Sequence, residues 1–322
     1  NDGACDIISL GRPLLADAHY VNKLRKNGFK SIRPCLSCHE GCMGRIQEYS
    51  ALNCAVNPEA CRERSERLIP TNKAKKVLII GGGVAGCEAA RVLTLRGHQP
   101  VLFEKTSKLG GNLIPGGTPD FKEDDHLLAD WYEYELNRLG VEVHKNKTIT
   151  ADEIHNFDAD EIILSTGSKP KVFSLGKGDV FTASEVLLGE KETGKEVVII
   201  GGGLVGCELA LWLKEKDKNV TIIEALPKIL SINGPLCHAN SEMLEALIPF
   251  NNINTIGSAK AKSYDGETLI IETADGEKSI KADSVVLAVG YESEKSLFAE
   301  IKNISKDIHV IGDANRVSNI MY

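Results

Sequence analysis

The chain has 322 residues, 42% of them hydrophobic and 26% charged, which predicts two or three packed domains and excludes a disordered or repetitive polymer. A net charge of −7 gives no basic surface, so we expect no nucleic-acid partner. The longest apolar runs, such as 77–80 and 197–200, fall far short of the roughly 20 residues of a membrane span. Because the N-terminal region also has no secretory pattern, we expect a cytoplasmic protein with no membrane partner.

The N-terminal segment contains ACDIISLGRPLLAD, an apolar stretch that runs into Gly11 and Arg12. Taken alone, the GRP tripeptide is a common strand-to-helix turn. The segment therefore predicts a strand before Gly11 and a helix after it.

Four of the nine cysteines follow, in the segment PCLSCHEGCMGRIQEYSALNC with the spacing C-x2-C-x3-C-x11-C. In a cytosolic chain such crowding suggests a metal centre rather than a disulfide framework. Structural zinc sites usually pair two C-x2-C knuckles, whereas three close cysteines and a distant fourth suit a loop around an iron-sulfur cube. We therefore favour a 4Fe-4S cluster over zinc and interpret His39 as a loop residue; the predicted ligands are Cys35, Cys38, Cys42 and Cys54.

A basic connector over 61–76 leads to the first glycine fingerprint, in the segment VLIIGGGVAGCEAARVLTLRGHQPVLFE at 77–104. Gly81, Gly83 and Gly86 form G-x-G-x-x-G directly after a predicted strand and at the start of a predicted helix, which is the context that this motif requires. Glu104 ends the next strand, where a carboxylate can accept hydrogen bonds from a ribose. The segment predicts a dinucleotide site.

The same pattern returns 120 positions later, where 197–224 matches 77–104 at 12 of 28 positions. The second fingerprint consists of Gly201, Gly203 and Gly206, with Glu224 at the strand end. A carboxylate there would repel a 2′-phosphate and no arginine follows directly, so we predict NADH, with NADPH less favoured and Lys228 leaving the choice open. Cys87 and Cys207 are interpreted as packing residues.

Further strands follow each fingerprint. A helix predicted over 125–139 precedes a strand over 161–165 that runs into Thr166 and Gly167. The stretch 281–293 repeats this arrangement, with its strand ending at Gly290, and 309–311 leads into Gly312 and Asp313. The repeat thus extends beyond the two fingerprints.

These motifs resemble the flavoprotein disulfide-reductase superfamily, in which one dinucleotide fold holds FAD and an inserted second fold holds the pyridine nucleotide. The resemblance implies FAD contacts from the first fingerprint and Glu104, and from Lys105, Gly111, Asn112, Thr166, Gly167 and Asp313. It assigns NADH contacts to the second fingerprint, Glu224 and Gly290.

The cysteine segment and ACDIISLGRPLLAD are similar to the 2,4-dienoyl-CoA reductase, enoate reductase and trimethylamine dehydrogenase family, relatives of Old Yellow Enzyme. This likeness implies that Gly11 and Arg12 help hold the phosphate of an FMN. The expected fold is α/β, with tandem Rossmann-like folds of the three-layer ββα FAD/NAD(P)-binding type preceded by the last strand of a TIM barrel and an iron-sulfur loop. The expected domains are a truncated FMN barrel end at 1–30, the cluster segment at 31–72, the FAD domain at 73–170 and 305–322, and the NAD(P)H domain at 171–304.

The resemblance implies an electron route from NADH through FAD and the cluster to FMN, which reduces an activated C=C bond of the 2-enoate or 2,4-dienoyl-CoA type. We expect a small-molecule substrate in a full-length enzyme of which this chain is a fragment, leave a homo-oligomer open, and predict no catalytic acid, base or nucleophile in these residues. The alternatives are an electron-input subunit resembling that of glutamate synthase, or a redox-sensing nucleotide-binding module.

Overall fold

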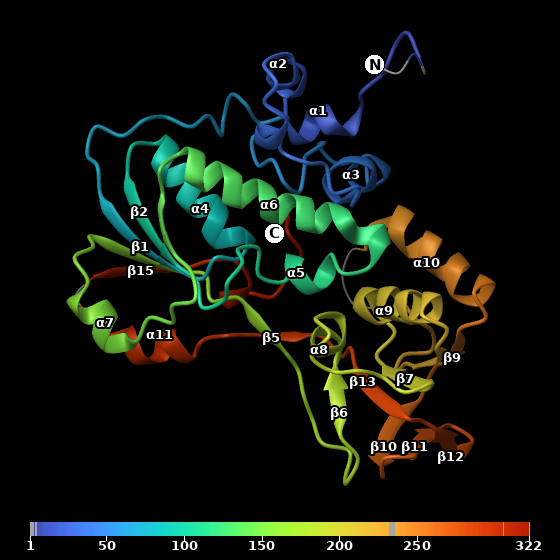
Figure 1. The fold of residues 1–322 in the computed structure, drawn as a ribbon. Helices are drawn as coiled ribbons and strands as arrows, with labels where there is room; N and C mark the ends of the chain where they lie inside the picture. Colours follow the sequence, from blue (N-terminus) through green and yellow to red (C-terminus); the bar gives the residue numbers. More distant parts are fainter. Residues whose placement is uncertain (1–2, 4, 232–235, 305, 322) are drawn as a thin grey trace. The chain divides into compact units, whose positions relative to one another are not determined.

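The computed structural model describes residues 3, 5–231, 236–304 and 306–321. The chain divides into two compact units. The first contains 1–113, 124–167 and 295–322, and the second contains 114–123 and 168–294. Figure 1 shows both units with their elements labelled.

The first unit is built on a parallel five-stranded sheet with the order β15-β4-β1-β2-β3. Its central strand β1 (Lys76–Ile80) is buried on both faces, which explains its continuous apolar sequence. The other strands are β2 (Gln99–Phe103), β3 (Glu142–His144), β4 (Glu161–Leu164) and β15 (Asp307–Val310). In register, Ile80 lies beside Phe103 on one side and Leu164 on the other, so these strands end together at one edge of the sheet.

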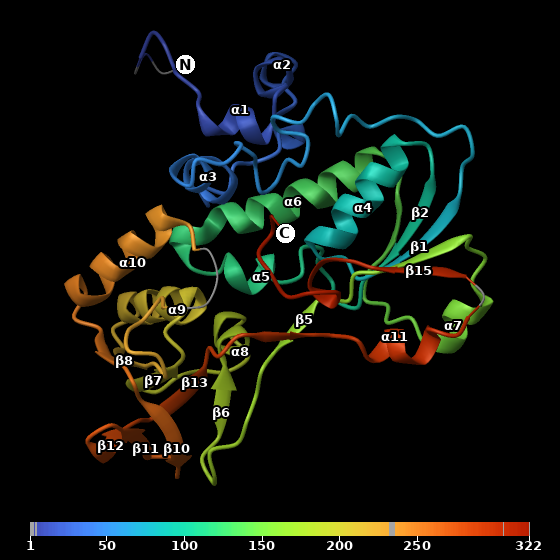
Figure 2. The ribbon, with the colours of Figure 1, turned by 180° about the vertical axis from the view of Figure 1, so that it is seen from behind.

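Helices cover both faces of this sheet. Figures 1 and 2 show α4 (Val84–Leu95) and α6 (Glu123–Arg138) on one face, and α7 (Ala151–Asn156) and α11 (Ser296–Ile301) on the other. On the second face, Ile154 of α7 and Ile301 of α11 are fully buried in one cluster with Leu78 of β1. Helices therefore form the outer layer here.

The second unit has the three layers expected of the ββα type. Its parallel sheet has the order β6-β13-β7-β8-β9, and its antiparallel meander the order β10-β11-β12. The parallel strands are β6 (Val180–Thr182), β7 (Glu196–Ile200), β8 (Asn219–Ile223), β9 (Asn254–Ile256) and β13 (Ser284–Leu287). The meander consists of β10 (Lys260–Tyr264), β11 (Thr268–Thr273) and β12 (Gly276–Lys281), and its buried Leu269 and Ile271 pack in one cluster with Val198 and Ile200.

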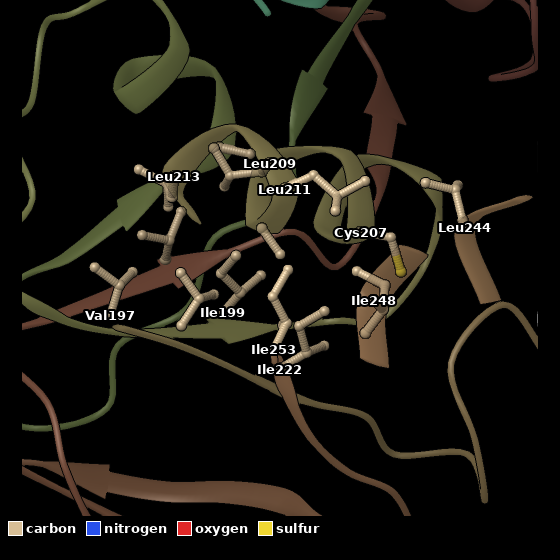
Figure 3. Close-up of a cluster of buried hydrophobic side chains, with 14 of the residues drawn as sticks. Val197, Ile199, Cys207, Leu209, Leu211, Leu213, Ile222, Leu244, Ile248 and Ile253 are labelled. Atoms are coloured by element: carbon tan, nitrogen blue, oxygen red, sulfur yellow. The ribbon is translucent and has the colours of Figure 1, made fainter. Parts of the chain in front are cut away.

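The opposite face of this sheet packs against α8 (Ala183–Leu187), α9 (Leu204–Glu215) and α10 (His238–Phe250). Figure 3 shows Ile199 and Ile222 of the sheet below Leu209 of α9, with Cys207 among these apolar side chains. Burial raises the pKa of the Cys207 thiol to about 12. Cys207 is therefore a neutral packing residue, as predicted, and the same holds for the fully buried Cys87 in α4.

Shorter elements complete the second unit and the links between segments. Strand β5 (Ser168–Pro170) pairs antiparallel with β14 (Tyr291–Ser293). The short helices are α5 (Leu113–Gly116), η3 (Asp120–Lys122) and, at the end of β15, η4 (Gly312–Ala314). No described helix is long and apolar enough to cross a membrane.

The N-terminal segment departs from its sequence-based expectation. Residues 5–10 form no strand, and Ile7 and Ile8 are 87% and 75% exposed. A parallel strand forms only when neighbouring strands satisfy its backbone, and no described strand of this chain lies beside 5–10. The predicted helix does form, as α1 (Arg12–Ala16), followed by α2 (Tyr20–Arg25), η1 (Phe29–Ser31), the single π turn η2 (Glu40–Gly44) and α3 (Arg45–Gln47).

The boundaries of the units also differ from the predicted domain limits. The sequence assigns 171–304 to the nucleotide domain, whereas the second unit contains 168–294 and the added segment 114–123. Residues 295–304 belong with the first unit because α11 buries Ile301 in its core. Segment 114–123 belongs with the second because, among other contacts, Lys122 Nζ lies 3.1 Å from Glu208 Oε1. Both differences depend on contacts between residues distant in sequence.

Candidate functional site

The first glycine turn lies where β1 ends and α4 begins. Gly81 has a φ of +105°, and a Cβ atom built there would lie 2.2 Å from the carbonyl oxygen of Ser165. A Cβ atom on Gly86 would lie 2.0 Å from the carbonyl oxygen of Gly81. Both positions must therefore be glycine for the protein's own packing, because the obstructing atoms are backbone.

Gly83 is different, because nothing in the protein obliges it to be glycine. Its φ is −71°, and the nearest heavy atom to an added Cβ, the Cα of Gly111, is 4.0 Å away. Gly83 is also the N-cap of α4, where no side chain caps the helix. The first turn of α4 thus lacks a side-chain cap and begins at a residue that has no Cβ, an arrangement that suits a pyrophosphate.

Glu104 follows β2, and its carboxylate is hydrogen-bonded to the first glycine turn. Its Oε2 accepts a hydrogen bond from the backbone N–H of Gly82 at 2.7 Å, and its Oε1 accepts two from Thr106, from the backbone N–H at 2.7 Å and the hydroxyl at 2.8 Å. The side chain is only 7% exposed, so its orientation is fixed. Lys105, the next residue, is exposed.

The other predicted FAD residues lie around the same turn. The backbone N–H of Gly110 donates to the Gly82 carbonyl at 2.8 Å, and a Cβ on Gly111 would lie 3.1 Å from the Gly83 Cα. Likewise, a Cβ on Gly312 would lie 2.7 Å from the Ala85 Cβ at the start of α4. The structure thus gathers at one sheet edge Gly81, Gly83, Gly86, Glu104, Gly111, Asn112, Thr166, Gly167 and Asp313, either directly or as chain neighbours of these contacts.

The second turn repeats the geometry of the first. Gly201 has a φ of +107°, and a Cβ on Gly206 would lie 1.9 Å from the Gly201 carbonyl oxygen. Glu224 Oε2 accepts from the backbone N–H of Gly202 at 2.7 Å, the same distance as in the first turn. Gly203 caps α9 without a side-chain bond, and Gly290 follows strand β13 with a φ of +90°. The two predicted dinucleotide turns are therefore equivalent in detail.

The hydrogen-bond partners of Glu224 in the described part of the chain are backbone N–H groups of its turn. Its Oε1 accepts from the backbone N–H of Leu226 at 2.8 Å. Lys228 was the residue that left the choice between NADH and NADPH open. Its Nζ lies 3.8 Å from Glu245 Oε1, and its side chain is 73% exposed. This arrangement is consistent with the predicted preference for NADH.

The four predicted metal ligands line one small cavity, together with Arg12, His39 and Gly41. None of the nine cysteines, all of which lie in the described part of the chain, forms a disulfide bond. Burial raises the pKa of Cys38 to about 12, and burial also raises the pKa of Cys54, with the neighbouring thiols adding to both shifts. Among the described residues, no three His, Cys, Asp or Glu side chains form a group that could hold a single metal ion. The sulfurs instead surround a shared space.

Arg12 and His39 meet at this cavity. Arg12 Nη1 lies 2.5 Å from His39 Nε2, so the side chain that was predicted to hold an FMN phosphate also contacts the cysteine loop. The other ring nitrogen, His39 Nδ1, is buried and has no hydrogen-bond partner among the residues that the structure describes. A buried ring nitrogen without a partner, beside four thiols, fits a cavity that accommodates a further polar group. The neighbouring Gly11 is exposed.

Arg33, which the sequence analysis did not single out, ties the cysteine segment to the first dinucleotide fold. Its guanidinium lies over the Trp131 ring of α6 at 4.6 Å and 4.0 Å from Glu88 Oε1 of α4, and it donates to the Val56 carbonyl at 2.7 Å. Its backbone N–H also donates to Asp17 Oδ2 at 2.9 Å. At 7% exposure, the residue is a buried connection among three segments. An arginine just before the first ligand cysteine was the available signal.

A wide hollow of about 870 Å³ lies elsewhere in the first unit, between the ends of β2 and β3 and helix α7. It is lined by Phe103, by His144 stacked on it at 4.6 Å, and by Phe157. None of the predicted cofactor residues lines this hollow.

Comparison with known proteins supports the dinucleotide folds. The pyridine nucleotide-disulphide oxidoreductase family matches residues 66–315. Cinnamate reductase from Clostridium sporogenes is 50% identical over 99% of this chain and 48% of its own length. NADH oxidase from Thermoanaerobacter brockii is 36% identical over 99% of this chain and 50% of its own length. The chain spans about half the length of the curated relatives that it matches.

Solved structures extend the likeness to the N-terminal segment. A 2-naphthoyl-CoA reductase has a TM-score of 0.92 and 27% identity, covering 99% of this chain and 49% of its own. A histamine dehydrogenase from Rhizobium shares the fold, with a TM-score of 0.85 and 20% identity. This match covers 99% of the present chain and 51% of the dehydrogenase chain. The similarity to cinnamate reductase and 2-naphthoyl-CoA reductase agrees with the resemblance to enoate reductases that the motifs indicated. The chain belongs to the pyridine nucleotide-disulphide oxidoreductase family.

Proposed function

We propose that this chain is the electron-input portion of an NADH-dependent flavin oxidoreductase. In this proposal the first fold holds FAD, the second holds NADH, and Cys35, Cys38, Cys42 and Cys54 hold a 4Fe-4S cluster. Bound flavin accepts an electron pair from a nicotinamide and can release the electrons singly, which an iron-sulfur cluster requires. The protein supplies positions for these groups, and no side chain is assigned as an acid, base or nucleophile.

The two glycine turns support the nucleotide assignments. In each, a carboxylate fixed by the turn's own N–H is oriented to accept hydrogen bonds from a ribose, and an uncapped helix N-terminus is available for phosphates. Buried Glu104 suits a resident cofactor. The more accessible Glu224, with Lys228 directed to Glu245, suits NADH that binds and leaves, with NADPH less favoured.

The single observation that carries the proposal is the convergence of four thiols on one cavity in the same unit as the first fold. An enzyme that transfers electrons only between NADH and a flavin does not need four converging thiols. Thiols that surround a space suit a cluster in which each cysteine binds a different iron. Through Arg33, the cysteine segment is fixed to α4, the helix that begins at the predicted FAD turn.

The final electron acceptor is proposed from the relatives. By analogy with cinnamate reductase and 2-naphthoyl-CoA reductase, it is the activated C=C bond of a small 2-enoate or 2,4-dienoyl-CoA type substrate. The resemblance to the Old Yellow Enzyme relatives suggests an FMN as the carrier that passes the electrons to this bond. This chain contributes Gly11 and Arg12 toward the FMN phosphate, which is only part of such a site. A cytoplasmic location is part of the proposal, and the oligomeric state is left open.

Anaerobic spectroscopy of the purified chain tests the proposal. We expect flavin absorption that NADH bleaches, and about four irons per chain. Cys42→Ala removes a cavity thiol, so iron content is expected to fall while flavin remains. Cys61→Ala is the matched control, because Cys61 is an exposed free thiol that does not line the cavity.

Three results would contradict the proposal. One zinc per chain without flavin would overturn both cofactor assignments. NADH binding without bleaching would favour the redox-sensing module. Equal iron loss in Cys42→Ala and Cys61→Ala would show that the cavity is not the cluster site.

A further inference from the structure

His39 lines the same cavity as the four predicted cysteine ligands. Its contacts give it a specific role. We propose that His39 Nδ1–H donates a hydrogen bond to a sulfur of the iron-sulfur cluster and thereby raises the reduction potential of the cluster. This inference rests on the proposed function, since it requires the cluster at the four cysteines. His39 is then a positioning and tuning residue, not a ligand.

The contact with Arg12 determines which ring nitrogen carries the hydrogen. A guanidinium has N–H donors and no acceptor, so the contact between Arg12 Nη1 and His39 Nε2 requires Nε2 to accept. In a neutral imidazole with an accepting Nε2, the hydrogen is on Nδ1. Arg12 therefore fixes the tautomer with a donor at Nδ1.

That donor has no partner in the described part of the chain. Nδ1 is buried and makes no hydrogen bond, although nearly all buried polar atoms in folded proteins do. The ring lines the same cavity as the four thiols, so the acceptor is a group that occupies this cavity. Thiolate and sulfide sulfurs of a cluster are such acceptors.

A hydrogen bond to sulfur changes the reduction potential without moving a proton. Reduction adds one electron to the cluster and increases the negative charge on its sulfurs, so a fixed N–H donor stabilises the reduced form more than the oxidised form. The donor stays on nitrogen throughout. Removing it is expected to make the cluster harder to reduce.

Redox titration of the full chain, followed by electron paramagnetic resonance, tests the inference with two variants. His39→Leu removes the donor. We expect the equilibrium constant for reduction of the cluster to fall about tenfold, which lowers the midpoint potential by about 59 mV for one electron. His39→Asn keeps an N–H donor near the position of Nδ1 and tolerates the left-handed backbone of residue 39, which has a φ of +59°. We expect the Asn variant to retain the wild-type potential.

A second measurement needs no substitution. In wild-type protein with ¹⁵N-labelled histidine, double-resonance spectra of the reduced cluster should show one ring nitrogen and one exchangeable proton coupled to it. No such coupling, or equal potentials in wild type and His39→Leu, would overturn the role of His39 while leaving the cluster in place. Absence of any cluster signal in the wild type, with no iron bound, would instead overturn the proposed function.

Discussion

Two pairs of helices in this chain begin in opposite ways. Helices α4 and α9 start at Gly83 and Gly203 with no capping side chain. Helices α7 and α8 start at Thr150 and Thr182 with complete capping boxes, in which the threonine accepts from the N–H of the third helical residue and the glutamate there accepts in return. The contrast lies within one sequence, so it reflects position in the fold rather than composition.

The difference indicates what each helix start is for. A capping box satisfies two N–H groups within the protein and typically stabilises it by about 1 kcal/mol. Leaving the longer helices α4 and α9 uncapped forgoes that stabilisation and keeps their N–H groups available to a phosphate. Substitutions at the two kinds of helix start should therefore separate stability from cofactor binding.

Gly86→Ala should have the largest effect. Its methyl group would lie 2.0 Å from the Gly81 carbonyl oxygen, so β1 and α4 would have to move apart. We expect the free energy of unfolding to fall by roughly 3 kcal/mol or more, with loss of flavin. Thermal unfolding of the flavin-free protein measures this; an unchanged midpoint would show that the turn relaxes easily.

Gly83→Ala, three residues earlier, is the matched comparison. Its methyl group meets no protein atom closer than 4.0 Å, so we expect the stability of the flavin-free protein to be nearly unchanged. FAD affinity should fall about tenfold to a hundredfold, about 1.4–2.8 kcal/mol, because the methyl group obstructs the pyrophosphate. Flavin titration measures it, with NADH binding at the second fold as internal control. Unaltered FAD affinity would place the pyrophosphate elsewhere.

Thr182→Ala tests a capped helix start. The Thr182 hydroxyl accepts from the Glu185 N–H at 3.3 Å, and the Thr182 N–H donates to Glu185 Oε2 at 2.7 Å. Loss of the hydroxyl should lower the free energy of unfolding by about 1 kcal/mol and leave NADH affinity unaltered. Denaturant unfolding and NADH titration of one sample check both expectations. Weaker NADH binding without loss of stability would contradict the view that capped helix starts serve stability and uncapped ones serve cofactor binding.

The smallest effect is the pH dependence at α7. Glu153 has its pKa lowered from 4.5 to about 2, first by the hydrogen bond from Lys147 and then by those from Thr150. Because its pKa is lower in the folded state, the carboxylate stabilises the fold above pH 4.5, and this contribution is lost as the pH falls toward 2. The difference in melting temperature between wild type and Glu153→Gln should therefore shrink over this range. A constant difference would show that charge is not involved.

Much of the fold could be predicted from local pattern. The glycine turns follow from residues within about 25 positions of each other, since strand, turn and helix of each unit are consecutive in the chain. The 120-residue repeat then identified the second turn, and the structure shows both carboxylates in the same geometry. The cysteine spacing likewise identified four side chains that line one cavity.

The N-terminal strand shows where local pattern fails. The apolar sequence of residues 5–10 suits a strand, but a strand also needs hydrogen-bonding neighbours, and no described strand lies beside it. The position of α11 fails for a related reason, since its place in the first unit depends on burying Ile301 against residues more than 130 positions earlier.

The sequence by itself determined which two turns share the glycine geometry of a dinucleotide fold and which cysteines line one cavity, because those signals are carried by glycines, acidic residues and thiols at fixed short spacings. Only the tertiary structure decided that Gly83 is free of packing constraints while Gly86 is not, that Arg33 joins the cysteine segment to α4, and that Arg12 contacts Nε2 of His39. These contacts join atoms from distant parts of the chain, and they leave no periodic trace in the sequence.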